Sequence, residues 1–311
     1  MYLLQKLQQR YGSGEARALY EIIMQHRFNL SRTDILLGKD TTLSADEQAE
    51  LQIIVERVAK GEPVQYVLGS EEFCGREFLV APGVLIPRPE TQQLVHLVEQ
   101  HLAPGSTVLD VGTGSGCIAV TLALAGYQVT ALDISEEALA IARQNADRLG
   151  AQVEFVRGDI LAPSLPFVAS SPIAPLLTGN CPLLGSALEA KGFPARTLPQ
   201  RGSRRGLCCI VSNPPYICES EAAGMDVNVL DYEPHLALFV PDDDPLLFYR
   251  AIADYGLTHL AEGGQIFFEA NRAYCSQVAE LLLQKYYKDV RIVNDQYDNE
   301  RFVFGSRRAA L

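Results

Sequence analysis

An apolar segment that runs straight into a glycine-rich turn is the feature that most constrains the fold of this chain. Residues 107–111 have the pattern of a buried strand, Gly-Thr-Gly-Ser-Gly follows over residues 112–116, and a helical pattern begins after it. Glycines let the backbone turn sharply and let a ligand approach it closely. The next strand, residues 128–132, ends in Asp133, where doubly wound α/β folds place a carboxylate that holds ribose hydroxyls. This order predicts a doubly wound α/β domain.

A second acidic residue belongs to the same expected edge of the sheet. The strand predicted over residues 153–157 ends in Gly158 and Asp159. The turn has the spacing Gly-x-Gly-x-Gly, whereas the dinucleotide-binding fingerprint is Gly-x-Gly-x-x-Gly. The combination of strand, turn, helix and acid is therefore better evidence than the glycines alone.

The segment Asn213-Pro214-Pro215-Tyr216 follows another predicted strand, residues 207–212. The Asn213 side-chain oxygen can accept one N–H of a planar NH2 group, and the Pro214 carbonyl can accept the other. The two prolines fix the backbone, so both acceptors are preorganised, and the Tyr216 ring can close one face. This pattern predicts that the chain holds an amide or an exocyclic base amine. With the glycine turn and the two acids, the order of motifs resembles that of the S-adenosylmethionine-dependent amino-methyltransferases.

The rest of the chain predicts three parts. Residues 1–62 show helical patterns throughout, which predicts a small docking or structural bundle. Residues 63–86 favour a β-hairpin connector whose first strand begins near Tyr66. Residues 87–311 form the predicted catalytic domain, with a seven-stranded, mostly parallel sheet and one antiparallel strand from a closing hairpin.

The segment 84–91, Val-Leu-Ile-Pro-Arg-Pro-Glu-Thr, precedes a helix that is expected to reach His101. Prolines on both sides hold Arg88 in an extended conformation. One interpretation is a simple linker into the helix. The other is a segment that wraps over the cofactor or the substrate.

Residues 162–206 do not fit the alternating pattern. They contain seven Pro, five Gly and five Ser, and they carry five basic residues but only one acid. A structureless loop of this length is unusual inside a compact domain. We expect a disordered insertion; a basic flap near the substrate and a stretch not native to the fold are the alternatives.

Composition excludes several classes of protein. A net charge of -12 argues against wrapping bulk nucleic acid, so no direct DNA binding is expected. Neither a membrane span of about 20 apolar residues nor a signal peptide is expected. The seven cysteines form no Cys-x-x-Cys pair, which favours a reduced, cytoplasmic chain without a metal site.

Four segments resemble the PrmC/HemK-type protein-glutamine methyltransferases. They are residues 84–91, Asp-Val-Gly-Thr-Gly-Ser-Gly at 110–116, Val-Ser-Asn-Pro-Pro-Tyr-Ile at 211–217 and Tyr-Glu-Pro-His-Leu-Ala-Leu at 232–238. Asn-Pro-Pro-Tyr alone is shared with DNA adenine methyltransferases, whereas the first segment joined to it is far more specific. The similarity omits the insertion, and Glu269-Ala270-Asn271 matches the family's strand-end pattern only in part.

The resemblance implies a Rossmann-like fold, S-adenosylmethionine as methyl donor and N5-methylglutamine as product. The implied substrate is the glutamine of the Gly-Gly-Gln loop in bacterial class I peptide chain release factors, which the N-terminal bundle would dock; we expect a monomer. The implied cofactor-binding residues are Gly112, Thr113, Gly114, Ser115, Gly116, Asp133, Asp159, Ile160 and Asn213. The implied catalytic and substrate-binding residues are Asn213, Pro214, Pro215 and Tyr216, with Arg88 and Glu90 added for substrate binding.

Three rival functions stay open at this point. A nucleic-acid adenine N6-methyltransferase would use the same four residues on a flipped base. A ribosomal-protein glutamine N5-methyltransferase would differ only in its partner. A binding module that has lost turnover is the third, and the intact Gly112, Asp133 and Asn213 argue against it.

Overall fold

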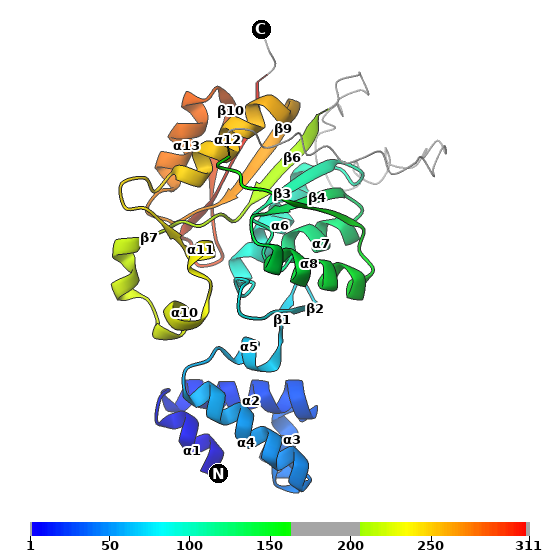
Figure 1. The fold of residues 1–311 in the computed structure, drawn as a ribbon, viewed down its shortest axis with the longest axis vertical. Coiled ribbons are helices and arrows are strands. Elements are labelled where there is room, and N and C mark those ends of the chain that lie inside the picture. Colours follow the sequence, from blue (N-terminus) through cyan, green and yellow to red (C-terminus); the bar gives the residue numbers. More distant parts are fainter. Residues whose placement is uncertain (1, 163–205, 309–311) are drawn as a thin grey trace.

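The computed structural model describes residues 2–162 and 206–308 (Figure 1). The expected insertion at residues 162–206 lies outside the described residues except for its two ends, so its predicted disorder is untested. No helix in the described ranges is long and apolar enough to cross a membrane.

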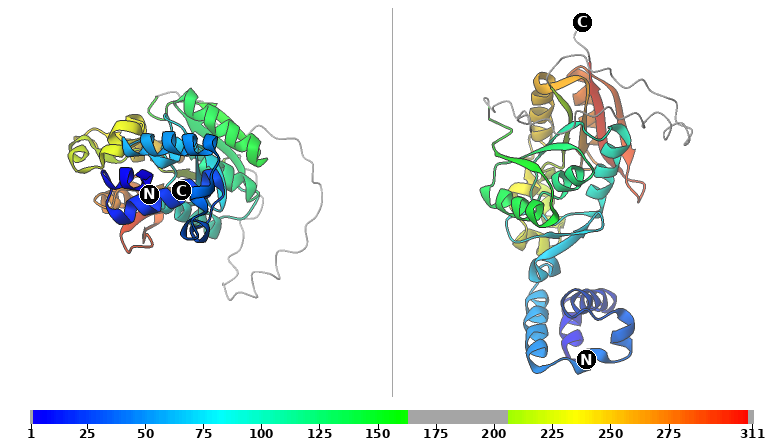
Figure 2. Two further views of the ribbon diagram at one scale, coloured as in Figure 1. Left: turned by 90° about the horizontal axis from the view of Figure 1, so that it is seen from below. Right: turned by 90° about the vertical axis from the view of Figure 1, so that its right-hand side faces the viewer.

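The first part of the chain is a helical bundle at one end of the molecule (Figures 1 and 2). Capping boxes at Ser31 and Ser44 begin two of its helices, each with the acidic residue three positions later. Leu7, Met24 and Val55 are fully buried in its core. Its elements are α1 (Tyr2–Gln8), α2 (Ser13–Phe28), α3 (Arg32–Leu36), a 3-10 turn (Lys39–Thr42) and α4 (Ala45–Ala59).

The connector after the bundle differs in part from its prediction. The expected strand near Tyr66 was wrong, because this residue lies in the short helix α5 (Val64–Leu68). Pro63 stands at the N-cap of α5, and Gly69 ends it in the left-handed conformation at φ 83°. The hairpin follows as β1 (Ser70–Phe73) and β2 (Arg76–Leu79), which pair antiparallel.

The catalytic part contains a seven-stranded sheet in the order β10-β11-β9-β6-β3-β4-β5. Only β11 runs antiparallel to its neighbours, β9 and β10, so the prediction of one antiparallel strand is confirmed. The strands are β3 (Thr107–Val111), β4 (Gln128–Asp133), β5 (Val153–Arg157), β6 (Leu207–Ser212), β9 (Leu260–Glu269), β10 (Tyr287–Asn294) and β11 (Glu300–Arg307).

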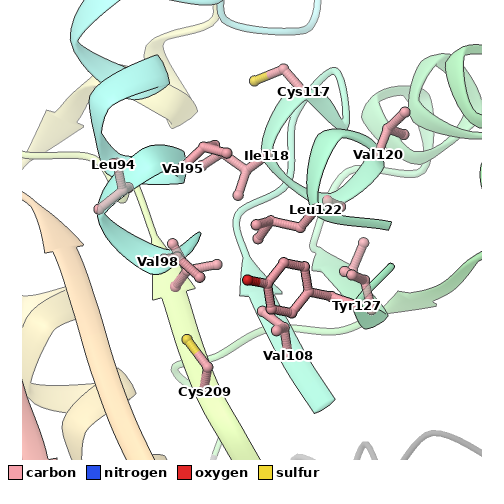
Figure 3. Close-up of a cluster of buried hydrophobic side chains, with 14 of the residues drawn as sticks. Leu94, Val95, Val98, Val108, Cys117, Ile118, Val120, Leu122, Tyr127 and Cys209 are labelled. Carbon is pink, nitrogen blue, oxygen red and sulfur yellow. The ribbon is translucent and has the colours of Figure 1, made fainter. Parts of the chain in front are cut away.

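Helices cover both faces of this sheet (Figures 1 and 2). Successive strand residues point to opposite faces, so Val108 and Leu109 of β3 enter different hydrophobic cores. One face packs against α6 (Pro89–His101), α7 (Cys117–Leu124) and α8 (Glu136–Leu149), and the other against α12 (Leu247–His259) and α13 (Cys275–Gln284). The first core is closed by aliphatic side chains of α6 and α7, among them Leu94, Val95, Val98, Ile118 and Leu122 (Figure 3).

Residues 217–240 form an arm between the catalytic part and the bundle (Figure 1). Asn228 of the arm accepts a hydrogen bond from Arg10 at 2.8 Å and donates one to the Tyr11 hydroxyl at 3.3 Å. The arm consists of β7 (Ile217–Cys218), a 3-10 helix (Glu219–Gly224), α10 (Val227–Tyr232), α11 (His235–Leu238) and β8 (Phe239–Val240).

The parallel strands end at a common edge of the sheet. β4 and β5 lie on one side of β3, and β6 and β9 lie on the other, so the strand order reverses between β3 and β6. Side by side at this edge lie Val111 of β3 and Ser212 of β6. In open α/β sheets, ligands bind in the crevice at such a reversal point.

Candidate active site

A cavity of about 370 Å³ opens at this edge. The loops after β3, β4, β5 and β6 contribute to its wall, as do the segment before α6 and the arm. Its lining includes Val84, Leu85, Gly112, Gly114, Asp133, Ile134, Glu137, Asp159, Ile160, Asn213, Pro214, Pro215, Pro234, Leu236, Ala237, Phe248 and Ile252. The predicted glycine turn, the two acids and Asn-Pro-Pro therefore meet at one cavity.

Gly112 and Gly114 present bare backbone to the cavity. Both have positive φ, at 74° and 55°, and a Cβ on either would meet no atom within 4 Å. The Gly114 N–H donates to the Asp133 carboxylate at 2.9 Å, and the Ser135 N–H donates to its other oxygen at 2.9 Å. Burial raises the pKa of Asp133, and these backbone donors act against that rise. Asp133 therefore holds the glycine turn in place while it lines the cavity.

Three residues of the turn do not line the cavity. The Thr113 hydroxyl donates to Asp110 at 2.7 Å, and the Ser115 carbonyl accepts from Asn145 at 2.9 Å. A Cβ on Gly116 would lie 3.0 Å from the Ala142 Cβ, so this glycine lets α7 pack against α8. A direct contact of these three with a cofactor is still a prediction.

Asp159 and Ile160 both line the cavity, as expected for residues beside an adenine ring. One oxygen of Asp159 accepts from the Leu161 N–H at 2.9 Å, which shapes the loop after β5.

The four residues after β6 divide between the cavity and the core. Asn213, Pro214 and Pro215 line the cavity. From the described residues, neither the Asn213 Oδ1 atom nor the Pro214 carbonyl receives a hydrogen bond. Tyr216 packs against the core, and its hydroxyl donates to Glu269 at 3.3 Å. Burial raises the pKa of Tyr216, so the hydroxyl stays a donor.

Arg88 and Glu90 do not line the cavity. Arg88 donates to the buried Glu233 carboxylate at 2.6 Å, and Glu90 lies half-buried in the first turn of α6. Their predicted contact with substrate is untested. The ion pair with Glu233 indicates a structural role for Arg88.

Sequence reasoning missed the roles of Thr91 and Glu269. The Thr91 hydroxyl accepts from Asn213 Nδ2 at 3.2 Å and donates to Glu269 at 2.8 Å. Burial raises the pKa of the Glu269 carboxyl to about 7. A signal for Glu269 was present, because an acidic residue at the end of a strand beside β6 reaches the same edge as Asn213.

The reversal of strand order and the residues that meet there place the chain in one class, the Rossmann-like methyltransferases that depend on S-adenosylmethionine. Comparison with known proteins agrees. A family profile described as the PrmC N-terminal domain matches residues 2–69, and one described as a methyltransferase domain matches residues 108–173.

Curated relatives make the assignment more specific. A release factor glutamine methyltransferase of Bacteroides thetaiotaomicron is 42% identical over 98% of this chain and 98% of its own length. One from Flavobacterium psychrophilum is 33% identical over 96% of this chain and 95% of its own. The chain belongs to the release factor glutamine methyltransferase family.

A solved structure with a related description is the release factor-specific protein-(glutamine-N5) methyltransferase of Alicyclobacillus acidocaldarius. It is 27% identical and covers 75% of this chain and 100% of its own, with a TM-score of 0.37.

Proposed function

We propose that the protein transfers a methyl group from S-adenosylmethionine to the side-chain amide nitrogen of the glutamine in the Gly-Gly-Gln loop of bacterial class I peptide chain release factors, forming N5-methylglutamine. One observation carries the proposal: Asn213 Oδ1 and the Pro214 carbonyl accept no hydrogen bond from the described residues, on the wall of the cavity that Gly112 and Asp133 also line. Two neighbouring acceptors match the two N–H bonds of a primary amide. Family membership supports the same substrate.

The lining of the cavity fits the proposed cofactor. Gly112 and Gly114 leave open space where side chains would stand. Asp133 has two oxygens, each with one backbone donor and further lone pairs for ribose hydroxyls. Ile134 and Ile160 supply apolar walls for an adenine ring. When bound, S-adenosylmethionine supplies an electrophilic methyl group.

The chain's own contribution is to position and polarise the amide. An amide nitrogen is a poor nucleophile, because its lone pair is delocalised into the carbonyl. Acceptors at Asn213 and Pro214 place partial negative charge beside the N–H bonds, where positive charge develops on nitrogen. Holding the reacting atoms about 3–3.5 Å apart in line supplies several kcal/mol of the barrier reduction. The proposal needs no general base, since the proton is acidic once the methyl group has been transferred.

The partner and location complete the proposal. The N-terminal bundle, residues 2–59, would dock the release factor, and Leu36, Leu37 and Ile53 are exposed there at 65%, 72% and 60%. The cytoplasm is the proposed location, since seven cysteines without a Cys-x-x-Cys pair favour a reducing compartment. A monomer that does not bind DNA is the proposed state.

Methyl transfer from labelled S-adenosylmethionine to a purified release factor tests the proposal. Label should appear on the native factor and not on one whose Gly-Gly-Gln glutamine is replaced by alanine, and mass spectrometry should find one methyl group on that residue. Ribosomal protein and duplex DNA are the comparison substrates for the two enzymatic alternatives. Equal or stronger labelling of either would overturn the proposal.

A further inference from the structure

Asn213, Thr91 and Glu269 form a continuous hydrogen-bonded chain from the cavity into the core. Asn213 Nδ2 lies 3.2 Å from Thr91 Oγ1, which lies 2.8 Å from Glu269 Oε2. The other oxygen of Glu269 accepts from the Tyr216 hydroxyl at 3.3 Å. Thr91 is 3% exposed and Glu269 1%. Thr91 lies at the start of α6, Glu269 at the end of β9 and Asn213 in the loop after β6. These three elements meet at one edge of the sheet (Figure 1).

The ionised Glu269 carboxylate determines which group donates and which accepts in each of these hydrogen bonds. A carboxylate only accepts hydrogen bonds, so the single hydroxyl proton of Thr91 must point to Glu269. Thr91 Oγ1 can then only accept from Asn213, and the group that faces it must be the Asn213 NH2. The carbonyl and NH2 ends of an asparagine have nearly the same shape, so packing alone does not choose between them. These hydrogen bonds therefore turn Asn213 Oδ1 away from Thr91. The oxygen stays free of Thr91 and can accept from a substrate amide.

The same carboxylate also fixes the far end of the Asn-Pro-Pro-Tyr segment. Tyr216 must donate to Glu269, and this holds its ring against the hydrophobic core that contains Tyr249. One buried group thereby sets the orientation of both Asn213 and Tyr216.

We propose that Thr91 and Glu269 are positioning residues, which orient the Asn213 amide so that its oxygen, and not its NH2, meets the substrate. The inference rests on the proposed function. Neither residue lines the cavity, so both act through Asn213.

Protonation of Glu269 would remove this fixed assignment of donors and acceptors. A protonated carboxyl must donate to one neighbour, so either Thr91 or Tyr216 would have to turn its own proton elsewhere. Around Glu269 lie Arg301, which favours the ionised form, and Glu90, which opposes it, together with the neutral Tyr216 and Tyr249. Burial raises the pKa of the carboxyl to about 7 against the lowering effects of Thr91, Arg301 and Tyr216. Turnover should therefore decline in acid as Glu269 takes up its proton.

The kinetic test compares Thr91→Val, Thr91→Ser and Glu269→Gln. Thr121→Val is the matched control, because Thr121 is buried and its hydroxyl has no hydrogen-bond partner among the described residues. Glutamine at position 269 presents an acceptor oxygen on one side and an NH2 group on the other, so only one of Thr91 and Tyr216 can still donate to it. We expect T91V and E269Q to lower kcat by about 100-fold, with KM for the release factor and Kd for S-adenosylmethionine within about twofold of wild type. T91S should keep most of the activity.

The pH profile separates positioning from simple structural damage. In wild type and T121V, kcat should decline as the pH falls below about 7. The pH profile of E269Q should lack this decline on its acid limb. Equal kcat in T91V and T121V, or an unchanged acid limb in E269Q, would overturn the inference. Circular dichroism verifies folding, and E269Q carries the test if T91V does not fold.

A readout without substrate keeps the two proposals distinct. In protein labelled with 15N-asparagine, the Asn213 side-chain NH2 signal should shift with a midpoint near pH 7 in wild type and T121V. It should not shift in T91V or E269Q. If this holds while wild type methylates no release factor, the proposed function alone is wrong. If wild type methylates but the signal does not titrate, the positioning inference is wrong.

Discussion

Arg88 donates a hydrogen bond of 2.6 Å to the buried carboxylate of Glu233, which lies 145 positions further along the chain. The other oxygen of Glu233 accepts from the Ile86 N–H at 3.2 Å. The Glu233 side chain is 2% exposed and that of Arg88 34%. The pair thereby joins the segment before α6 to the arm, whose Pro234 and Leu236 line the cavity.

Removing one partner of this ion pair should lower the free energy of unfolding more than replacing both partners. Arg88→Met leaves Glu233 charged, buried and unpaired, and we expect a loss of about 3 kcal/mol in the free energy of unfolding. The double variant R88M/E233Q should regain most of that stability. Urea unfolding and kcat/KM are measured together. If stability returns in the double variant while kcat/KM stays low, Arg88 also contacts substrate, as the sequence predicted.

Asp133→Asn tests the link between the glycine turn and the ribose. An asparagine keeps one acceptor oxygen but turns the other into a donor, which then faces an N–H of either Gly114 or Ser135. The dissociation constant for S-adenosylmethionine should rise by about 10- to 100-fold, measured by calorimetry. The KM for the release factor at saturating cofactor should change little. An unchanged cofactor affinity would contradict the assignment of Asp133 to the ribose.

Site residues that belong to local patterns were predictable from sequence. Gly112 and Asn213 each follow directly after a strand, and Asp133 is the last residue of one. The common edge of a parallel sheet brings such residues together. The error near Tyr66 was also local. Tyr and Val favour strands, but Pro63 and Gly69 bound a five-residue segment at the two ends where a short helix begins and stops.

Residues that depend on distant contacts were not predictable. The Thr91–Glu269 hydrogen bond joins positions 178 apart, and the Arg88–Glu233 pair joins a linker to the arm. No spacing in the sequence encodes either contact, since each depends on how α6 and the arm pack against the rest of the domain. Gly116 belongs to the predicted turn, yet its constraint is the approach of Ala142 on α8.

Charged substitutions on the bundle should weaken the release factor's binding without affecting chemistry. Leu37 and Ile53 are 72% and 60% exposed. Burying such side chains in an interface contributes about 1.5–3 kcal/mol each, so Leu37→Glu or Ile53→Glu should raise KM for the release factor about tenfold. Leu283→Glu is the control, since Leu283 is 53% exposed but lies on α13. Equal KM values in all three variants would argue against docking by these residues.

The buried carboxyl of Asp110 should make the protein less stable as pH rises. Burial raises its pKa to about 7, against the Thr113 hydrogen bond. An acid whose folded pKa exceeds its unfolded value stabilises the fold below the unfolded pKa, and this contribution is lost as pH rises through about 7. Between pH 5.5 and 8.5, the ionisation of Asp110 should therefore lower the free energy of unfolding by about 2 kcal/mol. Urea unfolding of Asp110→Asn should show a smaller decline than wild type, with the remainder from other carboxyls of raised pKa, among them Glu269 and Asp133. An equal decline would place the titration elsewhere.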